Sequence, residues 1–212
     1  TLQRAIILAP GEKGLALKIA EACKGLGKFK IAINFLEKLI KTNPDYTPAY
    51  ISLSGVYREL KEFRLCIKTS EIAVKLDPKS ETAINNLGVA YTENGNHHKA
   101  ISLYKKAIKL HPKNYKILTN LGMSYAFTGQ YTKAISILVQ ATKIEESYSE
   151  AHYVLGKVYV ETGFYEKSIM SFKRAHNLNA SNIEAARYMA HPLMYSYNFK
   201  CAWEQYEYRW IV

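Results

Sequence analysis

The sequence repeats with a period of 34 residues, and this period limits the fold more than any other feature. The Leu-Gly pairs at Leu87-Gly88, Leu121-Gly122 and Leu155-Gly156 are each 34 positions apart. The same spacing relates further residues of one kind: Tyr57, Tyr91, Tyr125 and Tyr159; Ala73, Ala107, Ala141 and Ala175; Pro10, Pro44, Pro78 and Pro112. A fixed period of this length is typical of stacked supersecondary units, none of which buries its apolar face alone.

Glycine, proline and the Leu-Gly pairs predict two helices in each repeat. Gly95 and Gly129 follow the first half of their repeats, and glycine tolerates the left-handed conformation that ends a helix. Pro78 and Pro112 follow the second half, because proline cannot continue a helix. We therefore expect paired helices of about 12–14 residues with short loops and no strands. Lys61 takes the glycine place in its repeat, so we expect a strained or different turn there.

The repeat at 81–114 carries most of the pattern, in the order Ile84, Leu87-Gly88, Tyr91, Gly95, Ala100, Tyr104, Ala107 and Pro112, with His97 where the next repeat has the aromatic Tyr131. This pattern resembles the tetratricopeptide repeat (TPR). The resemblance implies an all-α fold, a right-handed α-solenoid of about six antiparallel helix-pair repeats. It covers residues 1–212 as a single solenoid. The expected parts are a partial repeat at 1–12, repeats at 13–46, 47–80, 81–114, 115–148 and 149–182, and a divergent terminal repeat or cap at 183–212.

No catalytic, metal or cofactor site is visible in the sequence. The glycines recur at predicted helix ends and do not cluster after a strand, as a phosphate-binding loop requires. Cys23, Cys66 and Cys201 lack paired spacing, which argues against disulfides and suits a reducing compartment. His97-His98 has no further ligand at metal-binding spacing. No apolar run approaches the ~18 residues of a membrane span. We therefore expect a cytoplasmic, non-enzymatic chain without cofactor or metal.

The formal net charge of +11 raises the question of an anionic partner. The inner places of a TPR solenoid hold here as many basic as acidic residues: Lys18, Lys24, Arg58, Lys116, Lys157 and Arg187 against Glu21, Glu59, Glu93, Glu150, Glu161 and Glu184. The excess falls on predicted second helices, with Lys105, Lys106, Lys109, Lys133, Lys143 and Lys173. A basic convex face could bind nucleic acid or an anionic surface. Lysines that only keep the protein dispersed are the simpler interpretation, and nucleic acid is not the favoured partner.

The inner face offers amide groups near the middle of the chain. Asn86 and Asn120 occupy the same place in successive repeats, with Asn85 and Thr119 beside them. An asparagine both donates and accepts hydrogen bonds, so a stacked pair can hold the backbone of an extended peptide. This pair is similar to the asparagine ladder in the repeat region of O-linked N-acetylglucosamine transferases. The alternative is that these amides only face water.

Aromatic and basic side chains follow on the same predicted concave face. The remaining candidates for partner binding are Met123, Phe127, Tyr153, Lys157, Arg187 and Tyr188. Exposed aromatic side chains on a concave surface indicate a contact site, although near a chain end they also pack beneath a neighbouring domain. Both interpretations stay open.

The segment from Phe199 to Trp210 departs from the repeat pattern by its aromatic content. It resembles the segment that ends bacterial TPR regions immediately before a glycosyltransferase-like domain. The resemblance assigns Trp203, Tyr206 and Trp210 to a domain contact, and a hydrophobic terminal cap is the alternative.

The favoured function is a non-catalytic scaffold that binds a protein or an extended peptide. We expect the chain to be a fragment of a longer protein, where it recruits partners or substrates for an adjoining transferase-like domain. Self-assembly into a homo-oligomer through the open ends of the solenoid is a further alternative.

Overall fold

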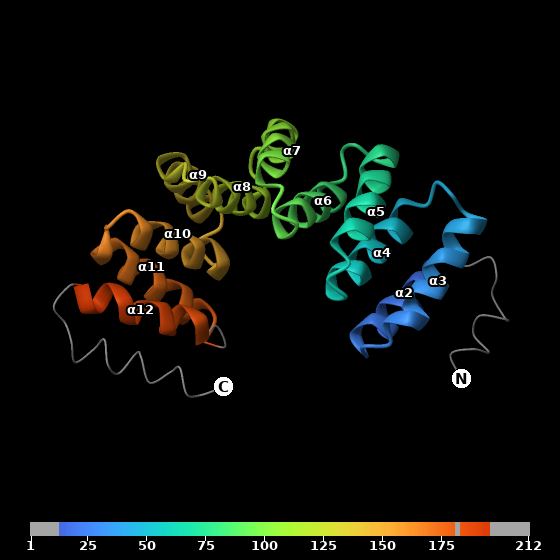
Figure 1. Ribbon diagram of the computed structural model, residues 1–212, viewed down its shortest axis with the longest axis horizontal. Helices are drawn as coiled ribbons and strands as arrows, with labels where there is room; N and C mark the ends of the chain where they lie inside the picture. Colours follow the sequence, from blue (N-terminus) through green and yellow to red (C-terminus); the bar gives the residue numbers. More distant parts are fainter. Residues whose placement is uncertain (1–12, 181–182, 196–212) are drawn as a thin grey trace. The chain divides into compact units, whose positions relative to one another are not determined.

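The computed structural model describes residues 13–180 and 183–195, and it is helical throughout these ranges, with no strand among them (Figure 1). The predicted all-α fold of antiparallel helix pairs is confirmed. The partial repeat at 1–12 lies outside the described residues, as do Trp203, Tyr206 and Trp210.

Each of the five repeats between residues 13 and 180 consists of a first helix of 13 residues and a second helix of 14. The first helices are α2 (Lys13–Gly25), α4 (Thr47–Glu59), α6 (Glu81–Glu93), α8 (Tyr115–Phe127), α10 (Ser149–Glu161) and α12 (Ile183–Tyr195). The second helices are α3 (Phe29–Thr42), α5 (Phe63–Leu76), α7 (His97–Leu110), α9 (Tyr131–Ile144) and α11 (Tyr165–Leu178).

The helices group into two compact units that divide between Leu103 and Tyr104, inside α7. The N-terminal unit holds α2 to α6, and the C-terminal unit holds α8 to α12. In the N-terminal unit the core lies between α2, α3 and α4, where Ala20, Leu36, Val56 and their neighbours are buried. Cys23 belongs to this cluster, as expected of a small core residue.

Local sequence explains where the helices start and stop. The Ser80 hydroxyl accepts a hydrogen bond from Ala83 N–H (3.3 Å) at the start of α6, and Asn114 Oδ1 accepts one from Ile117 N–H (3.0 Å) at the start of α8. These caps satisfy backbone donors that the first helical turn leaves without a partner. The turns after first helices use positive φ angles at Gly27, Gly95, Gly129, Gly163 and Lys61.

Gly122 and Gly156, the glycines of two Leu-Gly pairs, allow a close contact between the two helices of their repeats. A Cβ atom added at Gly122 would lie 2.5 Å from Cγ of Leu138, and one at Gly156 would lie 2.8 Å from the ring of Phe172. Leu138 and Phe172 are fully buried. Each pair of helices, α8 with α9 and α10 with α11, therefore packs a glycine of one helix directly against a large side chain of the next.

Candidate partner-binding site

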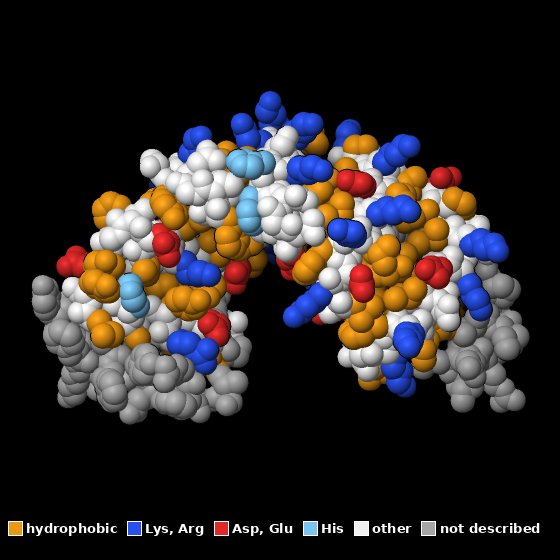
Figure 2. Space-filling model, viewed as in Figure 1, with side chains coloured by type: hydrophobic (Ala, Val, Ile, Leu, Met, Phe, Trp, Pro, Cys, Tyr) orange, Lys and Arg blue, Asp and Glu red, His pale blue; other side chains and the backbone are white. Residues whose placement is uncertain are grey.

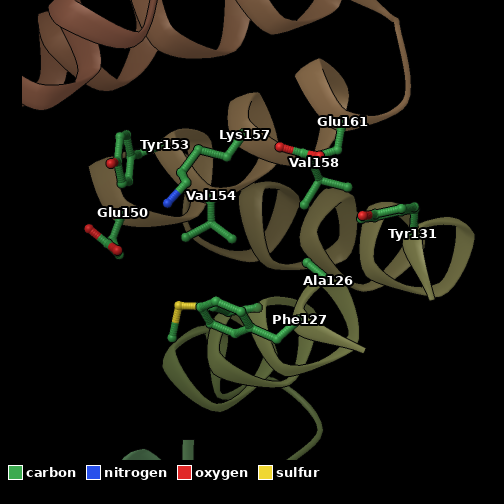
Figure 3. Close-up of a pocket in the computed structure, with 10 residues that line it drawn as sticks. Ala126, Phe127, Tyr131, Glu150, Tyr153, Val154, Lys157, Val158 and Glu161 are labelled. Atoms are coloured by element: carbon green, nitrogen blue, oxygen red, sulfur yellow. The ribbon is translucent and has the colours of Figure 1, made fainter. Parts of the chain in front are cut away.

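Side chains from α8, α9 and α10 of the C-terminal unit enclose an open recess of ≈ 410 Å³ (Figure 3). We call it the α8–α10 recess. Its lining consists of Met123, Ala126, Phe127, Tyr131, Glu150, Tyr153, Val154, Lys157, Val158 and Glu161. Four of the predicted site residues, Met123, Phe127, Tyr153 and Lys157, therefore lie together in one place.

The repeat itself explains why these four residues meet. Met123 and Lys157 occupy equivalent places in successive repeats, as do Phe127 and Glu161. Because α8 and α10 are neighbouring first helices, equivalent places on them lie side by side. Phe127 is 59% exposed, so much of its apolar ring is accessible from solvent. An exposed aromatic side chain in a recess is a typical contact site.

Lys157 occupies the centre of an aromatic cluster at the edge of the recess. Its Nζ atom lies 5.5 Å from the ring centroid of Tyr153 and 5.3 Å from that of Tyr188 on α12. The two rings meet edge to face, with centroids 5.8 Å apart. Cation–π attraction to both rings holds the lysine in place. Tyr188, another predicted site residue, thus contacts the site through Lys157.

Burial changes the electrostatics at the recess. The side chain of Glu150 is exposed, yet the surrounding side chains displace part of its water and raise the pKa of its carboxyl group. The Lys157 ammonium acts in the opposite direction, and its effect is the smaller of the two. Burial likewise raises the pKa of the Tyr153 hydroxyl, with the neighbouring Tyr188 adding to the effect.

Arg187 is held by an acidic neighbour on its own helix. Its Nη1 lies 3.2 Å from Oε1 of Glu184, one turn earlier on α12. Arg187 is not among the residues that line the recess.

The predicted amide positions are distributed over both units. Asn85 and Asn86 lie on α6 in the N-terminal unit, whereas Asn120 lies on α8 in the C-terminal unit, and all three are partly exposed. Thr119 is only 1% exposed, and its hydroxyl donates to the carbonyl of Tyr115 (2.8 Å). Thr119 therefore offers no surface to a ligand, because its place on α8 faces the core. The asparagine ladder remains a prediction.

Six further residues line the recess without being among the predicted site residues: Ala126, Tyr131, Glu150, Val154, Val158 and Glu161. Glu150 and Glu161 occupy inner-face places, but the sequence prediction counts them only in the charge balance. Tyr131 comes from α9, a second helix, which a rule based on first helices does not consider. Equal treatment of every inner-face place would have found both glutamates.

Residues 13–180 and 183–195 contain neither a metal-binding cluster nor a membrane-spanning helix. They hold no group of three His, Cys, Asp or Glu side chains able to bind a metal ion. None of the helices in this part is long and apolar enough to cross a bilayer. Cys23 and Cys66 are free thiols in buried positions, and burial raises the pKa of the Cys66 thiol.

The lysines responsible for the excess positive charge are all exposed, on α7, α9 and α11. Figure 2 shows basic and acidic side chains mixed over most of the visible face, with basic side chains alone along its upper edge; α7 and α9 contain no Asp or Glu. This mixture is ordinary for a protein surface that only needs to stay solvated.

The paired helices and the recess define a helix-repeat scaffold. Two family models match the sequence: Psidin, N-terminal TPR repeats region, over residues 25–155, and Tetratricopeptide repeat, over residues 149–182. The chain belongs to the tetratricopeptide repeat family. That family is a non-catalytic scaffold fold that binds proteins or peptides, which is consistent with the expected absence of enzyme activity in this chain.

Solved structures support the same fold at low sequence identity. A thermophilic TPR protein from Thermus thermophilus is 20% identical, with a TM-score of 0.73 over 86% of this chain and 99% of that one. YrrB, described as a TPR protein with an unusual peptide-binding site, is 17% identical, with a TM-score of 0.63 over 87% and 95%. The APC/C hetero-tetramer Cut9-Hcn1 gives 16% identity and a TM-score of 0.85 over 98% and 41%. No curated protein matches the chain.

Proposed function

We propose that this chain is a non-catalytic scaffold that binds a segment of a partner protein in the α8–α10 recess. The observation that carries the proposal is the exposed Phe127 side chain beside Met123 in a recess of ≈ 410 Å³. Recesses of about 300–1,000 Å³ are the size that proteins use to hold small ligands and single side chains. Burial of a large apolar side chain there contributes roughly 1.5–3 kcal/mol to binding.

A peptide selection with matched variants tests this proposal. A displayed peptide library is selected on the wild-type protein, and the affinities of the enriched peptides are compared with those for Phe127→Ala. Because Phe127 is exposed, the variant keeps its fold, which circular dichroism checks. We expect Phe127→Ala to weaken binding about tenfold, since it removes roughly 1.5 kcal/mol or more of apolar contact.

The control is Met170→Ala on α11, which removes another exposed apolar side chain (71% exposed) outside the recess. It should bind the peptides as the wild type does. Enriched peptides that bind Phe127→Ala with undiminished affinity would exclude the recess as the binding site.

The place of this scaffold in a larger protein is a further part of the proposal. The chain would recruit partners or substrates for an adjoining glycosyltransferase-like domain, and the aromatic segment around Trp203 and Trp210 supports this through its resemblance to segments that precede such domains. The parent gene tests it directly. Codons downstream that encode a strand, a glycine-rich turn and a helix would support it, and a stop codon in their place would refute it.

The exposed lysines of α7, α9 and α11 support a second candidate, the binding of nucleic acid or an anionic surface. Titration with single-stranded RNA and with duplex DNA at low and moderate salt separates this candidate from peptide binding. Phosphate binding must weaken steeply as salt rises, because each contact releases counterions. Peptide binding in an apolar recess should change little over the same range.

A further inference from the structure

The α8–α10 recess has a local charge opposite to that of the whole chain. Its lining includes two carboxylates, Glu150 and Glu161, and one ammonium group, Lys157. The chain as a whole has a formal charge of +11. A ligand that reaches the recess therefore meets a locally acidic site on a basic protein, and such a contrast selects among ligands by charge.

Lys157 only partly neutralises these carboxylates. Its ammonium group is engaged with the faces of Tyr153 and Tyr188. Its attraction to Glu150 is outweighed by the burial that raises the pKa of that carboxyl group. Glu150 is nevertheless exposed, so an incoming cation can reach it. A carboxylate that has lost water without gaining a close cation is a favourable place for a charged hydrogen bond.

The three charged residues of the recess lie in one row on α10, together with Val154. Glu150, Val154, Lys157 and Glu161 follow one another at intervals of three or four residues, so they share a face of α10. Figure 3 shows Val154 and the Lys157 side chain between Glu150 and Glu161. Eleven helical residues correspond to about 16 Å along the axis. About five residues of extended peptide span that distance.

We propose that the occupant of the recess is an extended peptide segment with a large apolar side chain at its centre and a lysine or arginine at each end. The apolar side chain lies against Met123 and Phe127. One basic side chain meets Glu150 and the other meets Glu161. This inference rests on the proposed function, because it specifies the ligand of the same recess.

Three labelled peptides test the charge requirement. They share a central phenylalanine between alanines and differ only at the ends, which carry lysine, glutamine or glutamate. Fluorescence anisotropy gives the dissociation constant of each. We expect the lysine peptide to bind about tenfold more tightly than the glutamate peptide at low salt, with the glutamine peptide between them.

Matched variants locate the effect at the carboxylates. Glu150→Gln keeps the size of the side chain and should weaken binding of the lysine peptide about threefold while leaving the glutamine peptide unchanged. Glu166→Gln on α11 removes an exposed carboxylate outside the recess and should change neither. Phe127→Ala should weaken all three peptides, because they share the apolar contact.

The outcomes distinguish the inference from the proposed function. Equal affinity of all three peptides, with loss of binding in Phe127→Ala, would overturn the charge requirement and leave peptide binding intact. Tighter binding of the glutamate peptide would also overturn it. No binding of any peptide would overturn both. Self-association of the peptide-free protein that disappears in Phe127→Ala would identify a second copy as the occupant and reject the peptide.

Discussion

At the scale of single residues, Lys61 shows what the repeat demands of the backbone. Its φ angle is 59°, in the left-handed region that Gly27, Gly95, Gly129 and Gly163 adopt at the equivalent places. Lys61 N–H donates to the carbonyl of Arg58, and Glu62 N–H donates to the carbonyl of Tyr57, both at 2.9 Å. The turn at Gly95 makes the same two bonds one repeat later. The expected strain is therefore present, and the form of the turn is unchanged.

Replacement of Lys61 by glycine should stabilise the protein. The left-handed conformation costs a residue with a side chain roughly 1–2 kcal/mol, and glycine avoids this cost. Part of the resulting gain in stability is lost, because glycine has more conformational freedom in the unfolded chain. We expect Lys61→Gly to raise the free energy of unfolding by about 0.5–1 kcal/mol in denaturant titration. Leu60→Gly is the control, because Leu60 has an ordinary φ of −79°. It should destabilise, and a gain in both variants would contradict the explanation by strain.

The glycines inside helices should respond to substitution in opposite ways. Gly156→Ala places a methyl group against the fully buried ring of Phe172, and such overpacking costs about 1–3 kcal/mol. Gly55→Ala meets only the Lys24 ammonium at 3.6 Å, and alanine favours the helix by roughly 0.5–1 kcal/mol. Thermal unfolding should show a lower melting temperature for the first variant and a higher one for the second. Equal losses would mean that close packing does not explain the difference.

At the scale of helices, a lysine of the second helix lies over a tyrosine of the first in three successive repeats. The Nζ atoms of Lys99, Lys133 and Lys167 lie 5.6, 5.7 and 5.9 Å from the ring centroids of Tyr91, Tyr125 and Tyr159. At the equivalent positions of the two earlier repeats, the exposed residues are Ile31 and Leu65. Some of the lysines on the second helices thus form a cation–π contact with the first helix of the same repeat.

Removal of one of these lysines should destabilise the protein, because the contact between the first and second helix of that repeat is lost. We expect Lys133→Gln to lower the free energy of unfolding by about 0.5–1 kcal/mol, the usual size of an exposed cation–π contact. Lys173→Gln removes the same charge from an exposed position on α11 and should change stability by less than about 0.5 kcal/mol. Equal effects of the two variants in denaturant titration would mean that net charge, and not the ring contact, is responsible.

The helices were predictable from the sequence because their signals are local. Glycine, proline and the Leu-Gly pairs act through backbone geometry and close packing, which hardly depend on distant residues. The recess was predictable in part, because the repeat phase indicates which helix face a residue such as Met123 or Phe127 occupies. Phase does not give the direction of a long side chain, and Arg187 accordingly pairs with Glu184 on its own helix. The prediction also considered only first helices, whereas Tyr131 lies on α9, a second helix.

At the scale of the whole molecule, both compact units contain tyrosines that burial makes harder to ionise. Tyr91 in the N-terminal unit donates from its hydroxyl to Oε1 of Glu71 at 2.6 Å, and its pKa rises to about 12, with burial as the largest cause. The pKa of Tyr57 is raised in the same way beside Glu37, one repeat earlier. In the C-terminal unit, burial raises the pKa of Tyr148 and Tyr159.

These shifts predict a loss of stability in alkaline solution. The pKa of Tyr91 is higher in the folded chain than the ordinary value of 10.0. The protonated Tyr91 hydroxyl therefore contributes its full share of folding stability below about pH 10, and this share disappears as the pH rises toward about 12. Denaturant unfolding at a series of pH values across that range should show a steep fall in the free energy of unfolding. Tyr91→Phe cannot ionise and should fall less steeply. Parallel curves for the two proteins would assign the alkaline loss to groups other than Tyr91.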